Sequence, residues 1–582
     1  AMHADSNPDA ASHTNSKYPS VWTSFVALAA FECGWIVVLA ILQLLNTGFG
    51  ITVWPNNEDT NYYMMLEAGG TRGIPSLFWI FDARNPLNPW FWVPLLSTVN
   101  HTQGYELFMV SRVVDFTLGC SVFMLLDAVT RSQCRAFSLA CGIAVLIWPF
   151  ARTDHVVWVF NLALAMSIVS LYCYCQFVMG NRQNSRWLAT GLLLYFLTIA
   201  TYTLHLWGIL AIPFLSLLLQ QHDQPNRAPW YSRFGSGCID LIWYFGFLAA
   251  YFLIWDTASP FSAPARGWMT LASVSKQLPM SVASLVISSA DIGHLLAISH
   301  LWNKGFLLGI SMFFASCYIF FFHKIFWPNP VGGPLLVSNT RPSMAELATL
   351  IAVLAALSAG IVQIESTTTI WSPGTRTPMV QKIVQPCLIV FASFMFIGLI
   401  PTKQAYLRRY LVIGCLASIC TLGSLLALCN NSDKWRVTEK HIHALKTVID
   451  SPLIKECASK NLVIILDKST GNFLPAFQFR KYLAPKLVPH ADSVTLVQVR
   501  SGPSRLINHT SVILEENNKG IALRLPKQIN GYTMVPYDQV AFFRYTSEEG
   551  LQKISELQEK DWQGTDANVL RKEWPVRFRP FK

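Results

Sequence analysis

Long apolar stretches recur through the first 429 residues of the chain and are separated by short polar segments. A transmembrane α-helix needs about 20 predominantly apolar residues to cross the hydrocarbon core of a bilayer. The pattern predicts eleven membrane spans, some of them shorter than this length. They lie at residues 21–45, 106–128, 136–150, 156–180, 187–204, 206–220, 238–255, 305–323, 343–363, 383–401 and 408–429.

The last part of the chain is more polar, and its apolar runs are much shorter than those of the first 429 residues. β-rich runs occur at 461–466, 493–499 and 520–525, between helix-like stretches at 438–448 and 548–559. The chain is therefore predicted to be mostly α, a polytopic transmembrane helical bundle followed by a soluble α/β domain. Its predicted divisions are a disordered tail at 1–19, a transmembrane domain at 20–429 and the α/β domain at 430–582.

Composition excludes an ordinary cytosolic enzyme. Hydrophobic residues make up 52% of the chain, charged residues only 13%, and the mean hydropathy is +0.36; soluble chains have about 25% charged residues. Residues 430–582 hold 23 Lys and Arg against 16 Asp and Glu. Of thirteen cysteines only Cys457 belongs to this tail, which excludes a disulfide or zinc framework there.

Basic residues set the predicted orientation. Four arginines crowd the loops after the second and fourth spans, whereas the long loop 46–104 holds two, so the N-terminus is predicted to be cytoplasmic and this loop external. Residues 187–220 are long for one upright crossing and short for two. A single crossing places the tail inside, and a pair places it outside; basic density in the later loops favours the pair. The four arginines are Arg131, Arg135, Arg182 and Arg186.

The first external loop carries an acidic pair, Glu58-Asp59, shortly after the first span and just before a helix-like run that contains Tyr62. A carboxylate at the membrane face is suited to accept a proton from a hydroxyl while a membrane-borne donor approaches from the side. The alternative is that Asp59 only caps the helix. Spacing alone leaves both interpretations open.

A cation follows in the same loop. Arg84 precedes prolines and the aromatic cluster Trp90, Phe91 and Trp92. A guanidinium at the membrane interface can bind a phosphate in two places while aromatic rings hold the lipid beside it. The alternative is a local pair between Arg84 and Asp82 beside an ordinary interfacial aromatic belt.

The order of these features resembles the start of GT-C superfamily glycosyltransferases. It comprises a first span, an acidic pair running into a helix at 58–62, a basic segment with proline at 84–86, and a span opening at 106–112. Within the superfamily the likeness is to the branch of lipid A aminoarabinose transferases and protein O-mannosyltransferases. It covers residues 20–180 by motif and the remainder by span pattern.

The resemblance implies an enzyme of the bacterial inner membrane, with a periplasmic tail. It transfers a hexosyl or pentosyl group from a polyprenyl-phosphate donor to a cell-surface glycan or lipopolysaccharide. Asp59 takes the proton of the acceptor hydroxyl, Arg84 stabilises the departing lipid phosphate, and the anomeric centre inverts. Glu58 orients Asp59 or binds the acceptor.

The other predicted external segments supply further candidates. Donor phosphate binding is assigned to Arg266 in loop 256–304 and to Arg376 and Lys382 in loop 364–382, each of which has the alternative of a solvated loop residue. No metal is assigned because the histidines lack the spacing of a metal site, and neither a cofactor nor a nucleic-acid partner is expected. The acceptor or orienting residues beyond Tyr62 are Arg152, Asp154, His155 and His294, with an Arg152 to Asp154 surface pair as the alternative for the first two.

Charges within the predicted spans need partners, and the span pattern bears on the competing classes of membrane protein. Glu32, Arg112 and Asp115 are costly in a bilayer unless paired, and Arg112 with Asp115 is the expected pair. A transporter or flippase would show inverted repeats or short, glycine-broken spans, and no such symmetry is visible. A polysaccharide polymerase or ligase, which uses a lipid diphosphate donor, is the other alternative.

Overall fold

A computed structural model describes the chain in two sets of segments. The first set covers 21–47, 105–130, 135–147, 158–201, 208–223, 229–258 and 383–392, with single positions at 87, 309, 313 and 317. The second covers 451–457, 460–466, 493–498, 515–516, 520–523, 532–546, 549–555 and 578–579.

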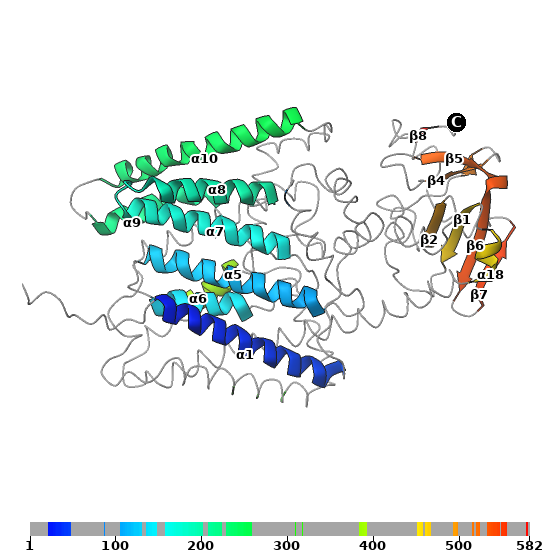
Figure 1. Ribbon diagram of the computed structural model, residues 1–582, viewed down its shortest axis with the longest axis horizontal. Coiled ribbons are helices and arrows are strands. Elements are labelled where there is room, and N and C mark those ends of the chain that lie inside the picture. Colours follow the sequence, from blue (N-terminus) through cyan, green and yellow to red (C-terminus); the bar gives the residue numbers. More distant parts are fainter. Residues whose placement is uncertain are drawn as a thin grey trace, which may run out of the picture.

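The described helices follow the apolar stretches closely and lie side by side (Figure 1). The structure has α1 (Val21–Thr47), α5 (Tyr105–Val129), α6 (Arg135–Ile147), α7 (Trp158–Met179), α8 (Ser185–Thr201), α9 (Ile212–Asp223), α10 (Trp230–Ala258) and the helix Ile383–Ala392. Four of them, α1, α5, α7 and α10, are long and apolar enough to cross a membrane. The predicted spans at 343–363 and 408–429 lie outside the described residues, and the total of eleven stays a prediction.

These helices are apolar around most of their circumference, so they bury one face and leave large apolar side chains exposed on the other. Val26, Val113, Ile239, Ile242 and Leu253 are 59%, 60%, 63%, 65% and 70% exposed. A helix that is apolar on all sides is typical of a protein core or a membrane span. Exposed apolar side chains in a row of parallel helices therefore indicate a surface that faces lipid.

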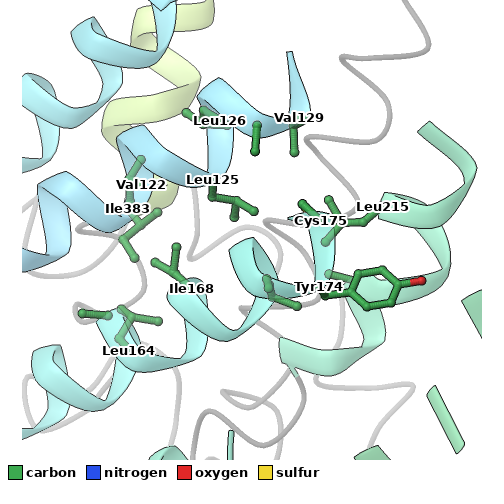
Figure 2. Packing of buried hydrophobic residues seen from close by; sticks show 14 of the residues in the cluster. Val122, Leu125, Leu126, Val129, Leu164, Ile168, Tyr174, Cys175, Leu215 and Ile383 are labelled. Carbon is green, nitrogen blue, oxygen red and sulfur yellow. The ribbon is translucent and has the colours of Figure 1, made fainter. Parts of the chain in front are cut away.

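The core lies between α5, α7 and α9. Figure 2 shows Val122 and Leu125 of α5 on the side of Ile168 of α7 and Ile383, and Val129 of α5 on the side of Cys175 of α7 and Leu215 of α9. All of these side chains are at most 6% exposed.

Close contact between α5 and α6 depends on two glycines. A Cβ atom placed on Gly142 would lie 3.0 Å from the carbonyl oxygen of Gly119, and one placed on Gly119 would lie 3.1 Å from the carbonyl oxygen of Gly142. Small residues of this kind let two helix backbones approach closely, which is a common mode of helix association in membranes.

The segment 187–220 forms two helices, α8 and α9, with α9 only 12 residues long. Arg182, just before α8, lies 3.4 Å from Ser216 Oγ of α9 and 3.0 Å from Ser236 Oγ of α10. The chain thus returns in α9 to the end of the bundle at which α8 begins, and α10 starts from that same end. This arrangement supports the pair rather than the single crossing.

The end of α7 is fixed by a left-handed turn. The amide of Asn181 donates to the carbonyl of Val178 and that of Arg182 to the carbonyl of Phe177, which is the Schellman pattern. Asn181 and Arg182 have φ angles of 52° and 60°. Asparagine tolerates this region, but arginine adopts it at a cost of about 1–2 kcal/mol.

Two four-stranded sheets make up most of the described tail. In the first, with strand order β2-β1-β6-β7, β1 (Asn461–Leu466) pairs in parallel with β2 (Ser493–Gln498) and β6 (Val540–Thr546), and β7 (Gly550–Ile554) pairs antiparallel with β6. In the second, β3 (Glu515–Glu516), β4 (Gly520–Leu523), β5 (Tyr532–Pro536) and β8 (Phe578–Arg579) follow in that order. The 3-10 helix η8 (Tyr537–Gln539) joins β5 to β6.

The strand predictions at 461–466, 493–499 and 520–525 are confirmed at β1, β2 and β4. Adjacent residues Leu462 and Val463 of β1 are both fully buried, as expected for a central strand covered on both faces. One short helix, α18 (Pro452–Glu456), accompanies the strands among the described residues. The α/β class of the tail and its boundary at 430 therefore stay predictions, and the helix expected at 438–448 lies outside the described residues.

The helix expected at 548–559 is wrong over its described part, which is strand β7. Glu549 N–H donates to Thr546 Oγ1 at 3.0 Å, Gly550 has a φ of +72°, and β7 lies antiparallel to β6. Pairing with β6, from Phe542 opposite Ile554 to Thr546 opposite Gly550, outweighs the local helix preference of the glutamates and lysine.

Candidate functional site

The predicted catalytic and binding residues all lie outside the described residues. They are Glu58, Asp59, Tyr62, Arg84, Arg152, Asp154, His155, Arg266, His294, Arg376 and Lys382. The structure describes the helix ends that flank two of their loops. The first loop leads into α5, and the segment 148–157 joins the end of α6 to the start of α7.

A buried charge network links these helix ends. The guanidinium of Arg112 donates from Nε to Glu32 Oε1 at 2.6 Å and from Nη2 to Glu32 Oε2 at 2.7 Å. The two side chains are 11% and 6% exposed. Parallel hydrogen bonds between a guanidinium and both oxygens of one carboxylate are among the strongest ionic contacts in proteins, so the network joins α1 firmly to α5.

Asp115 extends the network to α7. Its Oδ2 atom accepts from Arg112 Nη1 at 3.3 Å, and its Oδ1 atom accepts from Asn161 Nδ2 at 3.2 Å. Arg112 and Asp115 are three residues apart on α5 and therefore share a face of the helix. Asn161 lies in the first turn of α7, only four residues after the segment that carries Asp154.

The same guanidinium reaches α6. Arg112 Nη2 donates to the backbone carbonyl of Leu146 at 3.1 Å. Leu146 is the last residue but one of α6, where the helix has no backbone donor left for its carbonyls. Arg112 and its partners thus hold the end of α6 and the start of α7, the two points at which the predicted site segment 148–157 is attached.

The sequence prediction for these charges was correct in kind but incomplete. The expected Arg112 to Asp115 pair is confirmed, but the shorter contacts of Arg112 are to Glu32, 80 residues away. Asn161 and the carbonyl of Leu146 were not predicted. The rule that every charge within a span needs a partner would have pointed to Glu32, and Asn161 is an amide in an otherwise apolar helix opening.

No metal ligand set is seen in the described part of the chain, where no group of three or more His, Cys, Asp or Glu side chains is placed to hold an ion. The described charges of the network are one arginine, Arg112, and the two carboxylates of Glu32 and Asp115. We assign this network a structural role. It fixes the start of α5, the end of α6 and the start of α7, which are the helix ends next to the two segments predicted to carry the site.

Together these features define an integral membrane protein built on an apolar helical bundle, in which the buried charge network connects α1, α5, α6 and α7.

No protein-family model matches the sequence, and no curated protein sequence matches it. Among solved structures, the chain is similar to the crystal structure of ArnT from Cupriavidus metallidurans in the apo state. The identity is 13% over 82% of this chain and 86% of that chain, and the TM-score is 0.35. It is also similar to that of ArnT bound to undecaprenyl phosphate, with 12% identity over 80% and 85% of the two chains and a TM-score of 0.36.

Proposed function

We propose that the chain is an inverting glycosyltransferase of the bacterial inner membrane. It moves a hexosyl or pentosyl group from a polyprenyl-phosphate donor to a glycan or lipopolysaccharide acceptor on the outer face. The observation that carries the proposal is the first external loop, where Glu58-Asp59 and Arg84 follow the first span in the order that GT-C enzymes use.

In the proposed reaction Asp59 accepts the proton of the acceptor hydroxyl while the oxygen of that hydroxyl attacks the anomeric carbon of the donor sugar. The bond from that carbon to the donor phosphate oxygen breaks, and the lipid phosphate leaves with the electron pair. Because attack and departure occur on opposite faces, the anomeric centre inverts. Phosphate is a good leaving group and needs a cation rather than an acid, a role that Arg84 serves with Arg266, Arg376 and Lys382.

Glu58 and Asp154 are proposed to orient Asp59 or the acceptor, with Tyr62, Arg152, His155 and His294 as acceptor contacts. Support for bringing the two segments together comes from the charge network. Arg112 lies two turns into α5, directly after the loop of Asp59, and its partners hold both ends of the segment that contains Asp154. Catalysis by positioning requires such fixed attachment points.

The proposed orientation has two supports. The arginines Arg135, Arg182 and Arg186 gather where α6 and α8 begin, as the positive-inside rule expects of a cytoplasmic end. Figure 1 shows the strands of the tail beyond the opposite end of the bundle, where α10 finishes. Both favour a periplasmic tail.

The experiment that tests the proposal measures release of polyprenyl phosphate by the purified protein from a panel of polyprenyl-phosphate sugars, with crude cell-surface glycan as acceptor. Asp59→Asn is expected to lower turnover by about 10²- to 10⁴-fold, the usual effect of removing a general base. Glu67→Gln, a carboxylate in the same loop with no assigned role, is the matched control and should turn over as wild type does. If no donor is consumed, or if both variants match wild type, the proposal fails and a transporter of lipid-linked sugars takes its place.

A further inference from the structure

A second polar cluster lies at the opposite end of the bundle, where α7 ends and α10 begins. Arg182 Nη2 donates to Asp240 Oδ2 at 2.8 Å and to Ser236 Oγ at 3.0 Å. Asp240 Oδ2 also accepts from the hydroxyl of Tyr174 at 2.8 Å. The charge of Arg182 is thus matched by one carboxylate, and the left-handed turn at the end of α7 holds it in place.

Arg233, in the first turn of α10, is bound through its backbone to the described residues of the same cluster. Its carbonyl accepts from Ser216 Oγ at 3.1 Å and from Ser236 Oγ at 2.8 Å. Its guanidinium is different. The Nε and Nη1 atoms are buried from solvent, and in the described part of the chain neither has a hydrogen-bond acceptor.

Buried donors without acceptors are rare, because leaving one unsatisfied forfeits its bonds to water without replacing them. A guanidinium that remains charged at any physiological pH makes the imbalance larger. Among the described side chains the cluster contains two arginines and one carboxylate, Asp240, which Arg182 already engages. Arg233 therefore provides a fixed positive charge with donors suited to an anion.

The surroundings of Arg233 indicate what kind of anion fits. Trp230 and Tyr231 open α10, are each 65% exposed, and pack edge to face with ring centroids 6.1 Å apart. Trp230 and Arg233 are three residues apart and share a face of the helix. Exposed aromatic side chains at the end of a transmembrane helix are typical of the headgroup level of a bilayer.

We propose that Arg233 binds the phosphate of an anionic membrane lipid at this end of the bundle. The side chain of Arg233 is partly exposed, so its guanidinium can turn from the buried position to donate to the headgroup phosphate, and Trp230 packs against the lipid beside it. Basic sites between transmembrane helices on the cytoplasmic side are suited to such headgroups. This lipid is distinct from the donor of the proposed reaction, whose phosphate would be bound at the other end of the bundle.

The test uses the full-length protein in detergent, titrated with phosphatidylglycerol or with phosphatidylcholine and followed by native mass spectrometry. Wild type is expected to bind phosphatidylglycerol more tightly, because its headgroup carries a net charge of −1 and that of phosphatidylcholine carries none. Arg233→Gln should weaken phosphatidylglycerol binding about tenfold or more, the effect of losing a charged hydrogen bond, and Arg233→Lys should lie between the two. The backbone bonds to Ser216 and Ser236 survive both changes, and unchanged thermal unfolding of the variants verifies folding.

Arg186→Gln is the matched control, because Arg186 is an exposed arginine at the same end of the bundle whose side chain makes no ion pair in the described part of the chain. It should bind phosphatidylglycerol within about threefold of wild type, since an exposed charge interacts only weakly with a single opposite charge in water. Equal weakening in Arg186→Gln and Arg233→Gln would reduce the effect to general surface charge and overturn the proposal. Full displacement of phosphatidylglycerol by millimolar inorganic phosphate would overturn it in favour of a free anion. An Arg233→Gln variant that binds as wild type does would also overturn it.

Discussion

Arg112 of α5 donates two hydrogen bonds to the two carboxylate oxygens of Glu32 in α1, at 2.6 and 2.7 Å, across 80 residues of sequence. This contact helps to fix the position of α1 against α5. A charged side chain within a membrane span is costly in free energy unless an opposite charge lies beside it.

Breaking this pair is expected to destabilise the bundle. Glu32→Gln leaves the Arg112 charge buried with a weaker partner and should lower the free energy of unfolding by about 3–5 kcal/mol. Removing both charges in Glu32→Gln with Arg112→Gln should cost less than the sum of the single changes. Thermal or denaturant unfolding in detergent, followed by tryptophan fluorescence, gives the coupling energy. Strict additivity of the two changes would contradict a direct contact.

The same substitution should have opposite effects at two glycines. Gly142→Ala brings a Cβ to 3.0 Å from the carbonyl oxygen of Gly119, so α5 and α6 must separate, which costs about 1–3 kcal/mol of stability. Gly246→Ala in α10 meets nothing within 4 Å and should be neutral or stabilising by up to about 1 kcal/mol from helix propensity. Melting temperatures of the two variants in one detergent provide the comparison. A Gly142→Ala protein as stable as wild type would argue against the close helix contact.

Removal of the proposed phosphate ligand should affect both kinetic parameters. Charge on the donor phosphate is present in the bound donor and grows as the sugar departs, so Arg84→Gln is expected to raise KM and also to lower kcat. Arg84→Lys keeps the charge but loses the forked donor geometry and should fall between wild type and Arg84→Gln. Steady-state kinetics over a range of donor concentrations separate these effects. A change in kcat alone would move phosphate binding in the ground state to other residues.

The proposed orientation of the chain predicts which sites a membrane-impermeant maleimide can reach. The native Cys457 of the tail is buried and unsuited to labelling, so the probe is a single cysteine introduced into a cysteine-free protein. In intact spheroplasts Lys553→Cys, at an exposed position of β7, should react. Gln183→Cys, in the exposed turn before α8, should react only after the membrane is permeabilised. The reverse pattern of labelling would place the tail in the cytoplasm.

The helices were predictable because apolar runs of the required length leave a chain in a bilayer few alternatives to helix. The division of 187–220 was left open by length alone. The structure supports the pair through contacts that no local pattern contains, from Arg182 to Ser216 and Ser236.

Long-range pairing accounts for what the sequence did not predict. Local spacing correctly indicated Asp115 as a partner of Arg112, but Glu32 and the carbonyl of Leu146 become neighbours only when α1, α5 and α6 pack together. In the tail, β7 was mistaken for helix because its pairing with β6, rather than its own composition, sets its conformation. The catalytic candidates, and the external position of their loops, stay predictions from motif order and basic residues.

The separation of Glu32 from Arg112 has a consequence for synthesis of the protein. At about 5–20 residues per second, the ribosome needs on the order of 4–16 s to make the 80 residues between them. During this interval α1 reaches the membrane with an acidic side chain whose arginine does not yet exist. A chain halted before residue 112 should therefore release α1 into lipid less readily than one extended through α5, which makes α5 the element that completes insertion of the first helix.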